Sequence, residues 1–206
     1  LGPLNKKQKE YLGELYGINE RMIKLVFDML SVLKFESGAV EVKKEKFTAR
    51  SAFDKVLENL SAAAKNRDVD LVGLPKSQGD IIIEADSEIL KTILDIFVSN
   101  AIDYSKPKQK VVFGVVEDDS AVTLSVKDSG LGIPETEKKS IFGKFYRATN
   151  AKNHKPGGSG LGLYYALMLA ERIGGTVRFD SEEGKGSTFY LSIEKKFPQK
   201  VSNNKK

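Results

Sequence analysis

Apolar residues between positions 5 and 36 recur in steps of three and four, which predicts one long amphipathic helix. One stripe consists of Leu15, Ile18, Met22, Leu25, Met29 and Val32, and a second stripe beside it consists of Ile23, Val26, Leu30 and Leu33. An apolar face this wide is typical of a helical bundle. The helix therefore needs a partner. We expect a second copy of the chain or a helix outside it, and packing on the chain's own globular part is the alternative.

From residue 39 onward, alternating and helical patterns follow one another as they do in a mixed α/β domain. Strands are expected at 40–47, 69–74, 80–85, 110–117, 121–127, 176–181 and 187–193. Helices are expected at 50–67, from the N-cap Asp86 to residue 104, and at 160–173. Residues 129–159 form a long loop with a short helical piece at 135–142, and such loops commonly carry function. The predicted fold class is α/β, a two-layer α/β sandwich preceded by one long N-terminal helix.

Composition excludes several kinds of site. The chain has 206 residues and no cysteine, which excludes disulfides and thiolate metal sites, and its single histidine, His154, excludes a multi-histidine metal centre. The net charge of +5 is spread along the chain without a recognition motif, so we expect no nucleic-acid partner. No apolar run approaches the roughly 20 residues of a membrane span, and no secretory signal opens the chain. We therefore expect a cytoplasmic setting.

Asn100 continues the spacing of the apolar positions Ile89, Ile93 and Ile96 in the helix that ends at residue 104. A polar side chain on an apolar face must find a partner, or it costs about 1–3 kcal/mol. Its amide satisfies a neighbouring backbone group in one interpretation. In the other, its oxygen faces a Mg²⁺ ion that bridges phosphates, because this hard cation prefers oxygen ligands.

The stretch KDSGLGIPE, residues 127–135, places Asp128 at the end of an alternating strand, with Gly130 and Gly132 directly after it. A carboxylate at a strand end can accept a hydrogen bond from an exocyclic amine such as that of adenine. The glycines would let the backbone approach a flat ring. An ordinary turn that begins with aspartate explains the same residues equally well.

The stretch KPGGSGLGLYYALMLAERIGG, residues 155–175, alternates glycine at Gly158, Gly160 and Gly162 and then becomes strongly helical. The free N–H groups and the dipole at the start of a helix bind anions. The stretch matches neither of the two standard phosphate-binding glycine patterns. On its own it therefore indicates an anion site of unspecified kind.

Taken in order, these segments resemble the catalytic, ATP-binding domain of bacterial sensor histidine kinases, whose superfamily also holds gyrase, Hsp90 and MutL. A helix with asparagine, D-x-G-x-G, the segment IFGKFYRA, G-x-G-x-G and GKGST follow one another within residues 40–195. The helix at 5–36 resembles the second helix of the kinase dimerisation domain. The resemblance implies a partial dimerisation helix at 1–38, a catalytic domain of the Bergerat-type ATP-binding fold at 39–197, and a disordered basic tail at 198–206.

The resemblance also implies a role for each matched residue. Asn100 matches the asparagine that binds Mg²⁺, and Asp128 matches the aspartate that recognises the adenine amino group. Arg147 matches an arginine of the mobile ATP lid that reaches phosphate, so Asn100 and Arg147 are the expected catalytic residues. ATP and Mg²⁺ are the expected cofactors. The implied nucleotide-binding set is Asn100, Asp103, Tyr104, Asp128, Gly130, Gly132, Ile133, Phe145, Tyr146, Arg147, Gly158, Ser159, Gly160, Leu161, Gly162, Leu163 and Thr188.

Three features depart from the family pattern. The acceptor histidine and its helix are missing, and His154 lies in the lid sequence, where we expect it to be solvated. Asp103 stands where the family often has a lysine or arginine that contacts phosphate. An acid there should repel phosphate unless it meets Mg²⁺, Lys106 or Lys108. Ile96 replaces the glutamate that activates water in hydrolysing members, which argues against an ATPase.

The resemblance implies a protein-histidine kinase that transfers the γ-phosphoryl group of Mg-ATP to an imidazole nitrogen. Its implied partners are a histidine-bearing dimerisation helix, a response regulator and a second copy of the chain through the N-terminal helix. Many members of the family are membrane-anchored. A pseudokinase or interaction module that binds nucleotide without transfer is the alternative, favoured by Asp103 and the missing helix. A serine kinase of the anti-sigma type is a third possibility.

Overall fold

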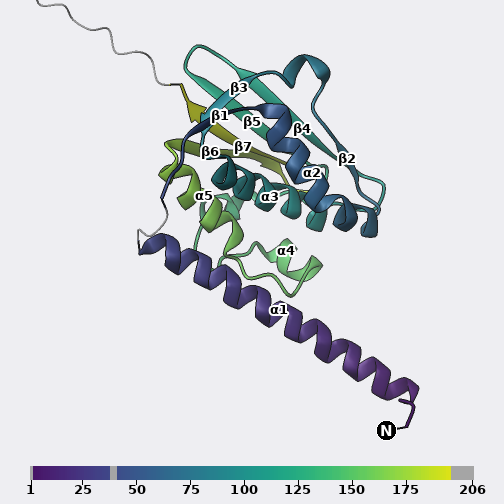
Figure 1. Ribbon diagram of the computed structural model, residues 1–206. Helices are drawn as coiled ribbons and strands as arrows, with labels where there is room; N and C mark the ends of the chain where they lie inside the picture. The colour runs from purple at the N-terminus through teal and green to yellow at the C-terminus, as the bar shows by residue number, and fades with distance from the viewer. Residues whose placement is uncertain (1, 38–40, 196–206) are drawn as a thin grey trace, which may run out of the picture.

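Five strands form the central sheet of the computed structural model, which describes residues 2–37 and 41–195 (Figure 1). Their order is β2-β4-β5-β7-β6, with β2 parallel to β4 and the other neighbours antiparallel. The strands are β2 (Asp70–Val72), β4 (Lys110–Glu117), β5 (Ala121–Lys127), β6 (Gly175–Glu182) and β7 (Gly186–Glu194). A separate antiparallel pair joins β1 (Glu45–Thr48) to β3 (Ile82–Ala85).

Three helices cover one face of the sheet, so the predicted two-layer α/β sandwich is confirmed. They are α2 (Ala49–Asn66), α3 (Ser87–Tyr104) and α5 (Gly162–Arg172). Alternation along β4 separates the two faces of the sheet: Phe113 is 2% exposed and belongs to the core, whereas Val116 is 66% exposed. Phe113 stacks on Phe53 of α2 with ring centroids 4.8 Å apart. The side chain of Asp86 accepts hydrogen bonds from the first-turn amides of α3, as expected for its N-cap.

Several element boundaries differ from the expected ones. The strand expected at 40–47 corresponds to β1, which is shorter and ends one residue later, and whose four residues pair with the four of β3. Residue 40 lies outside the described residues. Likewise, β2 and β3 are shorter than the strands expected at 69–74 and 80–85. The helix α5 begins at Gly162 instead of residue 160, because Gly160 has a left-handed φ of 69°.

The long loop before α5 contains more structure than expected. The short helical piece at 135–142 is confirmed as the 3₁₀ helix η2 (Glu135–Ser140). A second helix, α4 (Thr149–His154), was not predicted. A further 3₁₀ turn, η1 (Lys76–Gln78), precedes β3. We call residues 135–161, which include η2 and α4, the lid.

The expected N-terminal helix is α1 (Lys6–Glu36), which runs diagonally past the domain (Figure 1). Asn5 and Gln8 form a capping box at its start, and Ser37 is its C-cap. The basic tail expected at 198–206 lies outside the described residues. None of the helices that the structure describes has the length and apolar character needed to cross a membrane.

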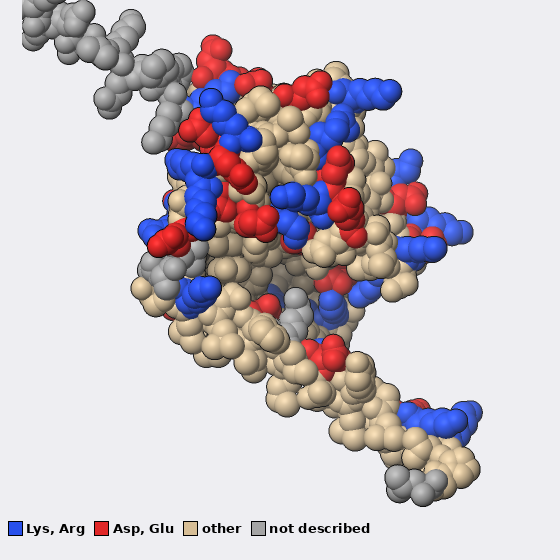
Figure 2. Space-filling model, viewed as in Figure 1, with Lys and Arg blue, Asp and Glu red and all other residues tan. Residues whose placement is uncertain are grey.

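The C-terminal half of α1 contacts the chain's own domain, and its last turns are the most deeply buried. Val32 is 1% exposed, and the ring of Phe35 meets that of Tyr165 edge-on at 6.3 Å. The other nine residues of the two apolar stripes are between 40% and 60% exposed. In Figure 2 most of the visible surface of α1 carries no charged side chain. The alternative of packing on the globular part is thus confirmed only for the C-terminal end, and the larger part of the apolar face stays uncovered.

Candidate nucleotide-binding site

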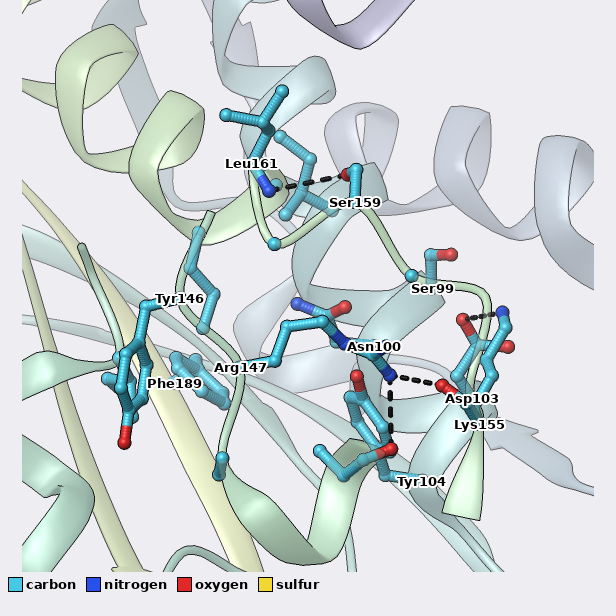
Figure 3. A pocket seen from close by; sticks show the side chains of 18 of the residues that line it. Ser99, Asn100, Asp103, Tyr104, Tyr146, Arg147, Lys155, Ser159, Leu161 and Phe189 are labelled. Carbon is cyan, nitrogen blue, oxygen red and sulfur yellow. Dashed lines mark hydrogen bonds and ion pairs between the residues drawn. The ribbon is translucent and has the colours of Figure 1, made fainter. Parts of the chain in front are cut away.

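A cavity of about 570 Å³ lies between α3, the loop after β5, the lid and the start of α5 (Figure 3). This volume falls in the ordinary range of small-molecule sites, roughly 300–1,000 Å³. Most of the residues expected from the sequence line it together, although they come from segments far apart in the chain. They are Asn100, Asp103, Tyr104, Asp128, Gly132, Ile133, Tyr146, Arg147, Gly158, Ser159, Gly160, Leu161, Gly162 and Leu163.

Three expected residues do not line the cavity, each for a physical reason. Ser187 and Phe189 face the cavity from β7, so strand alternation directs Thr188 between them to the opposite face. Phe145 has a left-handed φ of 64° and its side chain is 52% exposed. Gly130 acts through its backbone: a Cβ there would overlap the carbonyl oxygen of Tyr104 at the end of α3.

Asp128 is 6% exposed and is oriented by two backbone amides. Its Oδ1 accepts hydrogen bonds from the N–H groups of Gly130 at 2.8 Å and Ser187 at 3.2 Å. Burial raises the pKa of Asp128 above its ordinary value, and the two backbone hydrogen bonds oppose that rise. Because both donors are taken by Oδ1, the second carboxylate oxygen is left to accept a hydrogen bond from a ligand.

Asn100 presents its amide to the cavity. In Figure 3 no hydrogen bond links it to the other side chains drawn, and both interpretations of Asn100 stay predictions. Its oxygen fits Mg²⁺, which usually takes one or two protein oxygens and completes its shell with phosphates and water. Among the described residues, no three His, Asp or Glu side chains gather into a metal site. The donor set thus suits an ion that arrives together with phosphate.

The glycine pattern reflects close packing within the chain as well as room for a ligand. A Cβ on Gly160 would lie 2.7 Å from the carbonyl carbon of Phe145, and its φ is left-handed. Gly132 also has a left-handed φ, and a Cβ there would overlap the backbone of Glu182. The loop can therefore turn directly into α5, whose first-turn N–H groups have no partner within the helix. Those groups and the positive helix end favour an anion beside Gly162.

Asp103 does not pair with Lys106 or Lys108, the partners considered from the sequence. Its Oδ2 lies 2.5 Å from Nζ of Lys155 in the lid, and its Oδ1 lies 3.4 Å from the guanidinium of Arg67. His154 is exposed, as expected for a lid residue, and its Nε2 lies 3.2 Å from the backbone oxygen of Asp103. The acid at this position is therefore neutralised by cations from the lid and from the end of α2.

Arg147 lines the cavity, and its guanidinium binds carbonyl oxygens of the lid. It donates to the carbonyls of Ala151 and Pro156, each at 3.0 Å, and to that of Lys155. The expected contact with phosphate remains a prediction, since these bonds already engage both terminal nitrogens. Ile96 also lines the cavity, so the position of the water-activating glutamate is apolar here.

Sequence reasoning missed the contribution of α1 to the cavity wall, where Arg21, Asp28 and Ser31 lie. Asp28 accepts a hydrogen bond of 2.8 Å from the hydroxyl of Ser159 in the glycine-rich loop. The amphipathic pattern of the helix held no sign of this contact. Lid residues Asn150 and Lys155 were missed as well. The sequence offered Lys106 or Lys108 as cations for Asp103, whereas the structure pairs it with Lys155 and Arg67.

The model of the histidine kinase-, DNA gyrase B- and HSP90-like ATPase family matches residues 85–196, more than half of the chain. Among curated relatives, the sensor histidine kinase WalK of Bacillus subtilis is 33% identical over 182 residues. The circadian input-output histidine kinase CikA of Synechococcus elongatus is 30% identical over 193 residues. These alignments cover 87% and 93% of this chain but only 30% and 26% of the relatives.

Solved structures of histidine kinases are similar to this chain as well. Full-length ShkA in complex with AMPPNP is 25% identical and superposes with a TM-score of 0.76 over 93% of this chain and 40% of that one. The catalytic domain of the histidine kinase ThkA, also 25% identical, has a TM-score of 0.63 over 74% of this chain and 98% of that one. The chain therefore belongs to the histidine kinase-, DNA gyrase B- and HSP90-like ATPase family, and within it to the catalytic domains of sensor histidine kinases.

Proposed function

We propose that this domain binds Mg-ATP and transfers its γ-phosphoryl group to a histidine that lies outside the chain. The observation that carries the proposal is the convergence of Asp128, Asn100 and the start of α5 on one cavity. Asp128 offers a carboxylate oxygen to an adenine amino group, and the start of α5 offers N–H groups to phosphate. Similarity to ShkA, which was crystallised with AMPPNP, supports an adenine nucleotide as the ligand.

In this proposal the domain acts by positioning and by charge neutralisation. Asp128 fixes the base, while the first turn of α5 and the cations of the cavity orient the phosphate chain. When bound, Mg²⁺ would supply neutralisation of charge on the phosphates, with Asn100 as a protein ligand. The bond between the γ-phosphorus and its bridging oxygen breaks as a phosphorus–nitrogen bond forms to the imidazole, and ADP leaves. The apolar Ile96 offers no general base for water, which favours transfer over hydrolysis.

The partners in this proposal are a histidine-bearing dimerisation helix, a response regulator and a second copy of the chain. They are supported by the relatives, which are named as histidine kinases, and by the uncovered apolar face of α1. A cytoplasmic location belongs to the same proposal. The alternative is a module that binds nucleotide without transfer, and the charge pairing of Asp103 inside the site is the feature that favours it.

The test supplies the chain with ATP labelled on the γ-phosphate and with a separate dimerisation domain that bears a histidine. We expect acid-labile label on that domain, and loss of the label with Asp128→Asn or Asn100→Ala. Thr188→Val is the matched control, because this side chain faces away from the cavity and should leave transfer unchanged. ATP binding is measured by calorimetry on the same proteins. Mg²⁺-dependent binding without transfer to any supplied domain would favour the nucleotide-binding module instead.

A further inference from the structure

Asp103 lines the cavity beside Lys155 of the lid (Figure 3), and a second cation, Arg67, also contacts it. Lys155 reaches it from the lid at 2.5 Å and Arg67 reaches it from the end of α2 at 3.4 Å. The side chains of Asp103 and Lys155 are 22% and 36% exposed. A half-buried carboxylate that binds two cations loses little of its own neutralisation if one of them leaves.

Several contacts place Lys155 at this point. Arg147 binds the backbone carbonyl of Lys155, and His154 lies with its Nε2 near the backbone oxygen of Asp103. The ring of His154 is 6.4 Å from that of Tyr104, one residue further along α3. The backbone before the glycine-rich loop is thus held against the last turn of α3, and the ammonium group extends from it on a flexible stem.

The charges on the cavity wall make this lysine important for a ligand with several phosphates. Four carboxylates line the cavity, those of Asp28, Asp95, Asp103 and Asp128, against three cations, Arg21, Arg147 and Lys155. The terminal nitrogens of Arg147 already donate to lid carbonyls. The ammonium of Lys155 has no such geometric constraint, and Lys155 is only three residues from Gly158, where the loop approaches the expected anion position.

We propose that Lys155 is a phosphate-binding residue that Asp103 holds in the absence of nucleotide. When the phosphate chain enters, the ammonium exchanges the carboxylate for a phosphate oxygen, and Arg67 remains to neutralise Asp103. Many family members have a phosphate-binding lysine or arginine at the position of Asp103 on α3, and in this chain the lid supplies that cation instead. This inference rests on the proposed function. It adds that Asp103 competes with phosphate for one ammonium group, so that the pair sets how strongly the site prefers phosphorylated ligands.

The test compares the affinities for ATP and adenosine, measured by calorimetry in the presence of Mg²⁺. The Lys155→Met variant should bind ATP more weakly, on the order of tenfold, because it loses one charge-assisted hydrogen bond to phosphate. Its binding of adenosine, which has no phosphate, should be unchanged. Asp103→Asn should strengthen ATP binding several-fold because it frees the ammonium. In the double variant the gain from Asp103→Asn should vanish, since there is no ammonium to free. Lys152→Met is the control, because Lys152 belongs to the same lid but does not line the cavity.

Adenosine binding also reports whether each variant is folded, and Lys155→Gln provides a second, polar replacement. The inference is overturned if both Lys155 variants bind ATP as tightly as the Lys152→Met control. It is also overturned if Asp103→Asn weakens ATP binding and abolishes its Mg²⁺ dependence, which would make Asp103 a metal ligand. If the unaltered chain binds neither adenosine nor ATP, the proposed function fails and this inference fails with it.

Discussion

Asp128 is a buried carboxyl group, and its titration is linked to the stability of the fold. Burial raises its pKa, and the hydrogen bonds from Gly130 and Ser187 only partly oppose the rise. The folded protein therefore holds this proton more tightly than the unfolded chain does. The contribution of Asp128 to the free energy of unfolding is fully present below the ordinary pKa and is lost as the pH rises through the raised value. Above the raised pKa, ionisation of the buried side chain lowers the free energy of unfolding.

We therefore predict that Asp128→Asn unfolds at the same or a higher temperature near neutral pH, although it loses adenosine binding. The asparagine oxygen still accepts the two backbone N–H bonds, and the buried charge is gone. Thermal unfolding should show this advantage shrinking as the pH is lowered toward the ordinary pKa of aspartate. Asp119→Asn, the same change in an exposed turn, is the control and should alter neither property. A markedly lower melting temperature near neutral pH would show that the carboxylate has a structural role.

Single residues differ in how far their positions follow from the sequence. Asp128 and the three glycines Gly158, Gly160 and Gly162 line the cavity because a strand end and a helix start fix their places locally. Thr188 was placed wrongly, although the alternation of Phe189, Leu191 and Ile193 already puts it on the opposite face of its strand. The partner of Asp103 was sought at Lys106 and Lys108, its neighbours in the sequence, but the fold brings Lys155 of the lid to the end of α3 instead.

Among the elements, α4 shows why one helix was missed while longer ones were found. It has six residues with little apolar pattern, and no side-chain cap of its own holds its first turn. Instead, Glu137 of η2 accepts hydrogen bonds from the amide of Thr149 at 2.9 Å and from the hydroxyl of Tyr146 at 2.8 Å. Arg147 binds the carbonyls at the other end of the helix. Contacts from outside α4 thus stabilise it, and local sequence patterns do not register such contacts.

Replacing Glu137 should loosen this part of the lid without unfolding the domain. The hydrogen bonds from Tyr146 and Thr149 lower the pKa of Glu137, so its carboxylate is ionised and fully able to accept them at neutral pH. We predict that Glu137→Ala speeds amide hydrogen exchange across α4 and leaves the melting temperature nearly unchanged. Glu135→Ala is the control, because this carboxylate belongs to the same 3₁₀ helix but pairs with Lys138. Equal exchange in both variants would show that Glu137 does not hold α4 in place.

At the scale of the whole molecule, α1 carries the exposed apolar face and also contributes residues to the wall of the cavity. Asp28 binds the loop at Ser159, and Glu36 accepts hydrogen bonds from Lys144 and from the hydroxyl of Tyr164. The hydrogen bond from Lys144, followed by that from Tyr164, lowers the pKa of Glu36, which is thus ionised at neutral pH. A change in the position of α1 relative to the domain would therefore reshape the cavity wall.

The uncovered stripe of α1 leads to a prediction about assembly. Ile23, Val26, Leu30 and Leu33 are between 44% and 55% exposed, on the side of the helix away from Asp28 and the domain. Contiguous apolar surface of this kind is typical of interaction sites. We expect the chain to self-associate through this face, with a molar mass in solution that rises with concentration.

Leu30→Glu should shift this equilibrium toward the monomer, because association would then bury an unpaired charge. Light scattering with size-exclusion chromatography measures the shift, and Ser61→Glu adds the same charge at an exposed polar position of α2, outside the helix, as the control. Because Leu30 does not line the cavity, the variant should bind ATP like the unaltered chain. A monomer at every concentration before any substitution would mean that two copies of this helix do not suffice. The apolar face would then require a helix from outside the chain, which a supplied dimerisation hairpin should provide.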